Sequence, residues 1–205
     1  MRLFIVGANG RTGTELIDLA LARGHLVTAF VRSASKITRS HPQLQVVVGD
    51  PKDVNTLASA LPGHDAVLST LGIRGSEIFR RVTLLQECAA TTVAAMTRTG
   101  LRRLAIVSAA TLFPGGDWRY SLVRWILQNQ IRDLVVTEQI VSATDLDWTI
   151  ARPPRLDAVP GERYRAATDR LPDGAWSMSF RSVAAFLLDA VERRTHVREI
   201  VGLAA

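Results

Sequence analysis

The stretch Gly7-Ala8-Asn9-Gly10-Arg11-Thr12-Gly13 follows a short apolar run, residues 3–6, and leads into a helical pattern over residues 12–23. Glycines at these three positions permit a tight turn, a close approach of the backbone to a pyrophosphate, and close packing of the helix on a sheet. The start of such a helix also presents unpaired N–H groups and a positive dipole end to an anion. The stretch therefore predicts a phosphate-binding turn at the start of a βαβ unit.

Strand-like and helix-like patterns alternate along the rest of the chain. The expected strands are residues 3–6, 26–31, 44–48, 66–69, 104–107, 148–151 and a short one around 200–201. The expected helices are residues 12–23, 54–61, a long one marked from Ile78 to Met96, 131–143 and 183–193. Apolar strands joined through helices indicate a single α/β domain, residues 1–205, with a doubly wound parallel sheet of Rossmann type and helices on both faces. A substrate pocket is expected from the irregular stretches at about residues 109–130 and 153–180.

The composition excludes several classes of protein. With 205 residues, 47% apolar and 21% charged, the chain is ordinary globular material for one domain. The net charge is +6, but the arginines are scattered among acids, so we expect no nucleic-acid partner. We find no signal peptide and no apolar run of membrane-spanning length, and therefore expect a cytoplasmic protein without a membrane partner. The single cysteine, Cys88, excludes an intramolecular disulfide, and the histidines lack ligand spacing, so no metal is expected.

The end of the second expected strand indicates which dinucleotide binds. An NAD site usually has an acid about 20 residues beyond the glycines, whereas this chain has Arg32, with Lys36 close by. A guanidinium binds a 2′-phosphate in a fork, and Arg11 can reach the same phosphate from the glycine turn. We therefore predict NADP(H) as the cofactor. Asp50, after the third strand, either meets the adenine amino group or caps the helix that follows.

Further segments recur in a known order and spacing. They are Val31-Arg32, Gly49-Asp50, His64-Asp65-Ala66-Val67 and Leu146-Asp147-Trp148-Thr149-Ile150-Ala151-Arg152-Pro153. Together with the glycine turn, they make essentially the whole chain resemble the atypical short-chain dehydrogenase/reductase family, in its NAD(P)H-binding branch. That branch includes flavin reductase/biliverdin reductase B and the NmrA-like proteins. It contains reductases of flavins, biliverdin or quinones, and also cofactor-binding regulators without known turnover.

The resemblance implies roles for several residues in the cofactor site. Carried over by position, Gly72 lies near the ribose or pyrophosphate, with Leu71 beside it, and Ser108 lies beside the nicotinamide. Pro153, in the segment that ends the sixth strand, lies against the nicotinamide carboxamide. Where the flavin/biliverdin reductase pattern has a histidine after two prolines, this chain has Arg155, which favours an acidic or phosphorylated substrate.

The Tyr-x-x-x-Lys pair of typical members of the wider family is absent. The tyrosines are Tyr120 and Tyr164, and the corresponding helix positions hold Gln130 and Leu134. Epimerase or sugar-dehydratase chemistry is therefore not expected. Hydride transfer to a flavin or quinone does not require a strong protein acid, because the cofactor supplies the chemistry. Ser108 is the predicted catalytic residue, hydrogen-bonding either the substrate or the carboxamide.

Aromatic residues gather in or near the two irregular stretches: Phe113, Trp118, Tyr120, Trp125 and Trp176. They suit a flat conjugated substrate, and we predict that Phe113, Trp118 and Arg155 bind it. The alternatives are core packing for Trp125 and a dimer contact for the loop aromatics. Glu138 is either a carboxylate directed at the site or, as we favour, a residue at the solvated edge of its helix.

Two functions follow from these residues. The first is an NADPH-dependent oxidoreductase that transfers a hydride to a small planar acceptor such as a flavin or quinone, acting as a monomer or homodimer. The second is a non-catalytic NADP(H)-binding sensor or regulatory protein of the NmrA-like type, which the missing tyrosine and lysine favour.

Overall fold

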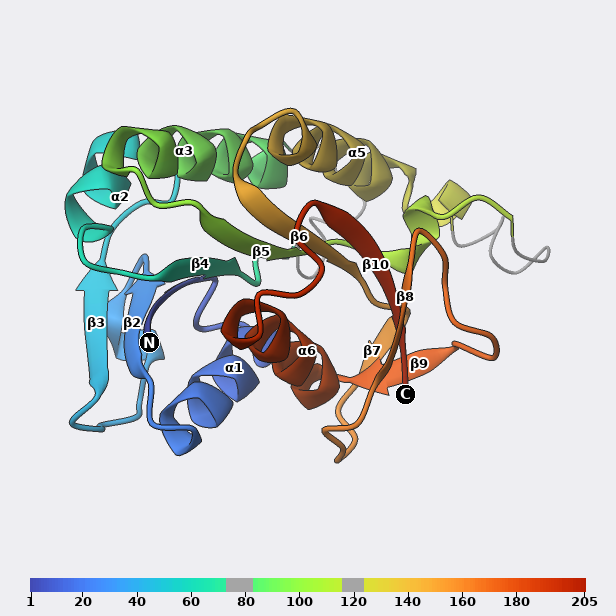
Figure 1. Ribbon diagram of the computed structural model, residues 1–205, viewed down its shortest axis with the longest axis horizontal. Helices are drawn as coiled ribbons and strands as arrows, with labels where there is room; N and C mark the ends of the chain where they lie inside the picture. The colour runs from blue at the N-terminus through green and yellow to red at the C-terminus, as the bar shows by residue number, and fades with distance from the viewer. Residues whose placement is uncertain (73–82, 116–123) are drawn as a thin grey trace.

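The computed structural model describes residues 1–72, 83–115 and 124–205 (Figure 1). The sheet in this part of the chain has eight strands in the order β3-β2-β1-β4-β5-β6-β10-β8. Their bounds are β1 (Arg2–Val6), β2 (Leu26–Val31), β3 (Leu44–Val48), β4 (Ala66–Ser69), β5 (Arg103–Val107), β6 (Asp147–Arg152), β8 (Arg165–Thr168) and β10 (Glu199–Ala204). All neighbours pair in parallel except β8, which runs antiparallel to β10 at the edge.

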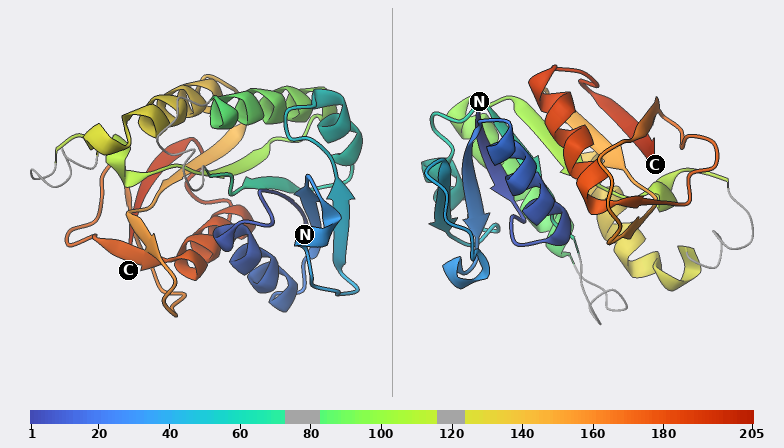
Figure 2. Two further views of the ribbon diagram at one scale, coloured as in Figure 1. Left: turned by 180° about the vertical axis from the view of Figure 1, so that it is seen from behind. Right: turned by 90° about the horizontal axis from the view of Figure 1, so that it is seen from below.

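Helices cover both faces of this sheet. The helices α1 (Arg11–Ala22) and α6 (Phe180–Glu192) pack side by side on one face. The helices α2 (Val54–Ala60), α3 (Leu84–Thr99) and α5 (Gln128–Ser142) cover the other face (Figures 1 and 2). The predicted single-domain α/β Rossmann fold with a parallel sheet is confirmed.

Strand β1 shows why the sheet must be covered on both sides. Its residues Leu3 to Val6 are at most 1% exposed. Leu3 and Ile5 belong to the apolar cluster that includes α1 and α6, whereas Phe4 and Val6 belong to the cluster that includes α2, α3 and α5. Alternate side chains of a strand point to opposite faces, so an uninterrupted apolar run requires an apolar layer on each side.

The stretch expected to be irregular, residues 153–180, contains three short strands. Two of them, β7 (Arg155–Asp157) and β9 (Ser177–Ser179), form a separate two-stranded parallel sheet, and the third is β8. They are three or four residues long and mostly polar, so they carry no apolar alternation that a sequence pattern could detect. Short 3₁₀ turns, η1 (Ala34–Lys36) and η3 (Ala110–Leu112), complete the elements that border the carboxyl ends of the strands.

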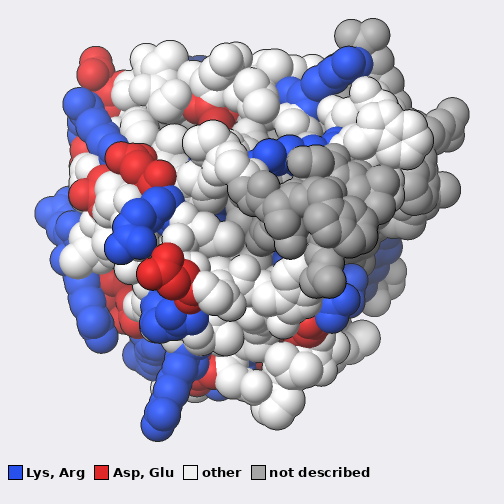
Figure 3. Space-filling view, turned by 90° about the vertical axis from the view of Figure 1, so that its right-hand side faces the viewer, with Lys and Arg blue, Asp and Glu red and all other residues white. Residues whose placement is uncertain are grey.

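Figure 3 shows the face of the molecule that carries β7 and β9. In its described part, uncharged side chains make up much of the surface, and acidic and basic side chains are interspersed at its margin.

Within the described ranges, no helix is both long and apolar enough to cross a membrane.

Helix α6 ends in a left-handed turn that glycine normally forms. Arg194, just beyond the helix, has φ 52°, and the N–H of Thr195 donates to the carbonyl of Ala190 at 3.1 Å. This is the Schellman pattern, in which the left-handed position usually holds glycine because a Cβ is unfavourable there. The side chain of Arg194 therefore strains the backbone at this position.

We expect Arg194→Gly to raise the free energy of unfolding by about 1 kcal/mol, because the left-handed conformation is then relaxed. Urea denaturation measures the change. The neighbouring Arg193 has φ −87°, so Arg193→Gly is a matched control, which should lower stability by about 0.5–1 kcal/mol through backbone entropy. A loss of stability in Arg194→Gly would contradict the strain.

Candidate functional site

The glycine turn connects β1 to α1 through contacts that leave no room for a side chain at Gly7 or Gly13. Gly7 has φ 81°, and a Cβ built on it would lie 2.8 Å from the backbone nitrogen of Leu71. A Cβ on Gly13 would lie 2.4 Å from the carbonyl oxygen of Gly7. The N–H of Gly10 donates to that same oxygen at 2.8 Å. The first helix can therefore approach the sheet this closely only with glycine at both positions.

The N-terminus of α1 is available to an anion. Gly10 is its N-cap residue, no side chain caps it, and no acid lies in its first turn. The first N–H groups of a helix have no intrahelical partner and carry the positive end of its dipole. These groups border a cleft of about 550 Å³ at the carboxyl ends of the strands.

The described lining of this cleft is cationic. It contains Arg11, Arg32 and Lys36 but no Asp or Glu. Most cofactor residues predicted from the sequence lie in it: Gly7, Asn9, Gly10, Arg11, Thr12, Arg32, Leu71, Gly72 and Ser108. Arg32 and Lys36 are exposed at the β2 side, and no hydrogen bond or ion pair joins either side chain to another described residue. Two cations without a partner in the described part of the chain, beside a helix N-terminus, suit a ligand with several phosphates.

Three predicted cofactor residues do not line the cleft: Gly13, which packs against the turn, Asp50 and Pro153. Asp50 is exposed and does not line the cleft; its Oδ1 accepts from the N–H of Lys52 at 3.0 Å. The alternative that Asp50 caps the next helix is wrong, because Asp53 is the N-cap of α2 and accepts from Asn55 at 2.9 Å. Pro153 lines the neighbouring pocket, and its carbonyl accepts from the N–H of Ala110 at 2.8 Å.

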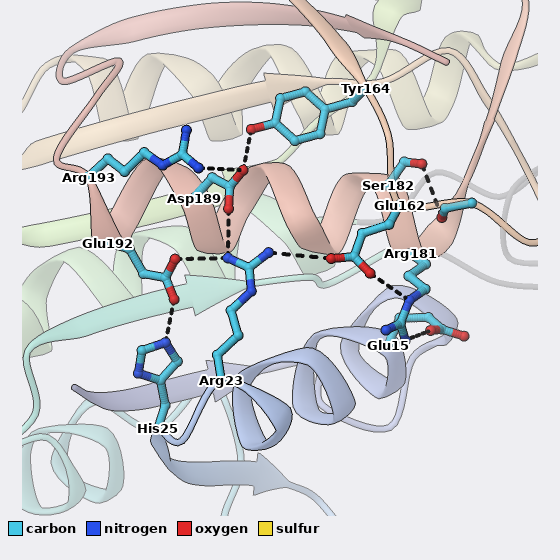
Figure 4. Close-up of polar contacts among 11 residues, drawn as sticks. Glu15, Arg23, His25, Glu162, Tyr164, Arg181, Ser182, Asp189, Glu192 and Arg193 are labelled. Carbon is cyan, nitrogen blue, oxygen red and sulfur yellow. Dashed lines mark hydrogen bonds and ion pairs between the residues drawn. The ribbon is translucent and has the colours of Figure 1, made fainter.

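Ion pairs hold α6 against α1 (Figure 4). Arg23, at the end of α1, pairs with Asp189 and Glu192 of α6 at 2.6 and 2.8 Å. Near the other end, Arg181 of α6 pairs with Glu15 of α1 at 3.2 Å. The start of α6 is thereby fixed beside the glycine turn.

Phe180, the first residue of α6, is a part of the cleft that the sequence did not reveal. The guanidinium carbon of Arg11 lies 4.5 Å from the centre of the Phe180 ring, a cation–π contact. Arg11 is thus held toward α6, the helix that packs on β5 and β6. Arg32, by contrast, follows β2, which lies on the other side of β1 in the sheet. No spacing in the sequence connects residues 11 and 180, so only the packing of α6 on α1 brings them together.

Ser108 carries an unsatisfied hydroxyl at the end of β5. The residue is 8% exposed, and its N–H donates to the carbonyl of Ala151 at 2.7 Å. Its Oγ is buried and has no hydrogen-bond partner among the described residues. Buried hydroxyls are normally hydrogen-bonded, so this atom, on the lining of the cleft, is suited to bond a ligand.

A second pocket, of about 430 Å³, adjoins the cleft. Gln130 and Leu134 of α5 line both spaces. The described residues around the second pocket come from both irregular stretches and from α5: Ala109, Ala110, Thr111, Leu127, Gln130, Ile131, Leu134, Pro153, Pro154, Arg155 and Trp176. The lining is mostly apolar, as ligand pockets are.

The aromatic residues predicted near the site are dispersed. Phe113 is 8% exposed and does not line this pocket, and Trp118 lies outside the described residues. Trp125 is 70% exposed, so core packing is wrong for it, whereas Trp176 does line the pocket.

Cys88 is buried as expected, and burial raises the pKa of its thiol to about 11.

Glu138 is buried and paired, so its expected position at a solvated edge is wrong. Its two oxygens accept from Nε and Nη2 of Arg152 at 3.0 and 2.6 Å. The guanidinium carbon of Arg152 also lies 4.6 Å from the centre of the Phe113 ring. A second carboxylate of α5, that of Asp133, accepts from the N–H groups of Leu85 and Gln86 at 2.9 Å each. These contacts fix α5, and with it Gln130 and Leu134.

The glycine turn, the open helix start and the cationic cleft define a dinucleotide-binding protein of Rossmann type. The chain belongs to the NAD(P)H-binding family, whose family model matches residues 7–194. The resemblance to atypical short-chain dehydrogenases/reductases is therefore confirmed at the level of NAD(P)H binding.

Individual relatives agree with this family. The chain is 28% identical over 181 residues to the uncharacterized sugar epimerase YhfK of Bacillus subtilis (strain 168), covering 85% of this chain and 81% of that protein. A Rossmann-fold NAD(P)-binding family protein from Shigella flexneri has a TM-score of 0.76 at 25% identity, over 98% of this chain and 92% of that chain. A short-chain dehydrogenase/reductase from Veillonella parvula DSM 2008, solved in complex with NADP, shares the fold, with a TM-score of 0.77 at 19% identity over 100% and 94% of the two chains.

We expect Glu138→Ala to lower the free energy of unfolding by about 3–5 kcal/mol, because it leaves the guanidinium of Arg152, 12% exposed, without its partner. The double variant Glu138→Leu, Arg152→Leu should recover much of this loss, since both charges are then removed. Chemical denaturation of the three proteins measures the effect. If Glu138→Ala kept the stability of the wild type but lost its catalytic activity, Glu138 would instead be a catalytic base.

Proposed function

We propose that the chain is an NADPH-dependent reductase that delivers a hydride to a small planar acceptor. The observation that carries this proposal is a cationic cleft, with no carboxylate in its described lining, that adjoins an apolar pocket along Gln130 and Leu134. Such a pair of spaces suits a phosphorylated cofactor on one side and a flat acceptor on the other.

The residues of the cleft fit NADP(H) part by part. Arg32 and Lys36 would hold the 2′-phosphate, and the N–H groups at the start of α1 would hold the pyrophosphate. The free Oγ of Ser108 would bond the carboxamide or the acceptor. Bound NADPH supplies a hydride, which is two electrons with one proton.

The second pocket, called the acceptor pocket from here on, offers no general acid within the described residues. Its polar side chains are those of Thr111, Gln130, Arg155 and Trp176, none of which readily gives up a proton at neutral pH. An acceptor that gains a hydride here takes its second hydrogen as a proton from water. Flavins and quinones meet this requirement. The mostly apolar lining also offers few partners for the hydroxyl groups of a sugar, which supports a reductase over the epimerase activity in the name of the Bacillus subtilis relative.

Consumption of NADPH, followed through its nicotinamide absorbance, tests this function against a panel of flavins, quinones and biliverdin-like acceptors. We expect turnover that depends on the acceptor and is faster with NADPH than with NADH. Tight NADPH binding with every acceptor silent would overturn the reductase and leave the non-catalytic sensor.

Arg32→Glu should raise KM for NADPH by about 10–100-fold, because it replaces a charge-assisted hydrogen bond with repulsion of the 2′-phosphate. KM for NADH, which lacks that phosphate, should change much less. Arg163→Glu makes the same charge change at an exposed arginine that lines neither the cleft nor the acceptor pocket, and should leave both constants near the wild-type values. Equal effects of Arg32→Glu on the two cofactors would exclude Arg32 from 2′-phosphate binding.

A further inference from the structure

The acceptor pocket has a single charged side chain in its described lining, that of Arg155. The side chain is 66% exposed, so it lies where the pocket opens to solvent. Gln130 and Leu134, by contrast, lie where the pocket meets the cofactor cleft. The pocket therefore has a cationic mouth and a neutral amide at its junction with the cleft, with apolar walls between them.

The backbone of Arg155 is fixed by its neighbours. Pro153 and Pro154 precede it and are buried, and the carbonyl of Pro153 accepts from Ala110. In the parallel β7–β9 sheet, Arg155 pairs with Ser177, the residue that follows Trp176 in the sequence. The guanidinium is thus presented from a fixed strand, on a side chain long enough to adjust to a ligand.

Most hydrogen-bond donors of Arg155 have no partner among the described residues. One Nη2–H group donates to Oδ2 of Asp157 at 2.9 Å, and no other hydrogen bond or ion pair joins this guanidinium to a described residue. A guanidinium has five N–H donors in a planar fork. Asp157, two residues along β7, lies on the same side of the strand and occupies one edge of the fork.

We propose that Arg155 binds an oxyanion of the acceptor, so that the substrate is a planar conjugated molecule with a phosphate, sulfonate or carboxylate at the end away from its reducible ring. This inference rests on the reductase proposed above. The anion lies at the pocket mouth and the ring faces Gln130 and Ser108. An apolar wall alone would hold neutral and anionic acceptors equally, whereas the guanidinium selects the anion.

Asp157 weakens this selection in the free protein. The hydrogen bond from Arg155 lowers the pKa of Asp157, so its carboxylate is charged at neutral pH and competes with an incoming oxyanion. Removing this carboxylate without changing its shape should therefore strengthen anion binding. A purely structural Arg155–Asp157 pair predicts no such gain.

Riboflavin and riboflavin 5′-phosphate provide a matched test, because they share the reducible ring and differ by one phosphate. In the wild type we expect kcat/KM to favour the phosphate by about tenfold, as one charge-assisted hydrogen bond allows. Arg155→Gln should abolish this preference, mainly by raising KM for riboflavin 5′-phosphate. Asp157→Asn should increase the preference. Arg163→Gln, at an exposed arginine outside the pocket, should leave the ratio unchanged.

Binding without turnover separates this inference from the reductase itself. Quenching of flavin fluorescence gives the dissociation constants of both flavins with NADP⁺ present, whether or not NADPH is oxidised. A tenfold ratio that Arg155→Gln removes supports the anion site even if turnover fails. Equal affinities, no binding of either flavin, or an equal effect of Arg155→Gln on both would overturn it.

Discussion

The contact between Gly13 and the carbonyl oxygen of Gly7 is the constraint on which the rest of the site depends. A single methyl group at Gly13 would lie 2.4 Å from that oxygen. One at Gly7 would lie 2.8 Å from the backbone nitrogen of Leu71, which follows β4. The absence of both allows α1 to start at Arg11, one short turn after β1 ends at Val6. Its uncapped N–H groups then face a cleft whose other described walls hold Arg32, Lys36 and the free hydroxyl of Ser108.

The opposite wall of the site is carried by α5, which two buried carboxylates hold in place. Asp133 binds the first N–H groups of α3, and Glu138 binds the guanidinium at the end of β6. Both carboxylates are satisfied by these contacts, so neither is left for proton transfer. Their effect is to fix Gln130 and Leu134 between the cofactor cleft and the acceptor pocket. The side chains that meet at this junction are neutral, which agrees with hydride chemistry that needs no protein acid.

The sequence predicts the features that local physical rules determine. Strands buried on both faces appear as apolar runs, and the glycine turn with Arg32 marks the cofactor cleft. Contacts between distant segments carry no such signal. The pairing of Glu138 with Arg152 and the stacking of Arg11 on Phe180 depend on how α5 and α6 pack, and an acid within an apolar stripe looks the same whether paired or solvated. The sequence allows Asp50 as the cap of the helix expected from residue 54, whereas the structure shows Asp53, the residue directly before that helix, in this role.

The measurement that tests this account most directly is the affinity of the wild-type protein for NADP⁺ and NAD⁺, by isothermal titration calorimetry at low and high salt. Arg32 and Lys36, which pair with no described residue, predict that NADP⁺ binds more tightly by at least about tenfold, since one charge-assisted hydrogen bond to the 2′-phosphate gives that ratio. The advantage should shrink as salt screens the exposed Arg32 and Lys36. Equal affinities, or tighter binding of NAD⁺, would contradict the cleft as a site for the 2′-phosphorylated cofactor.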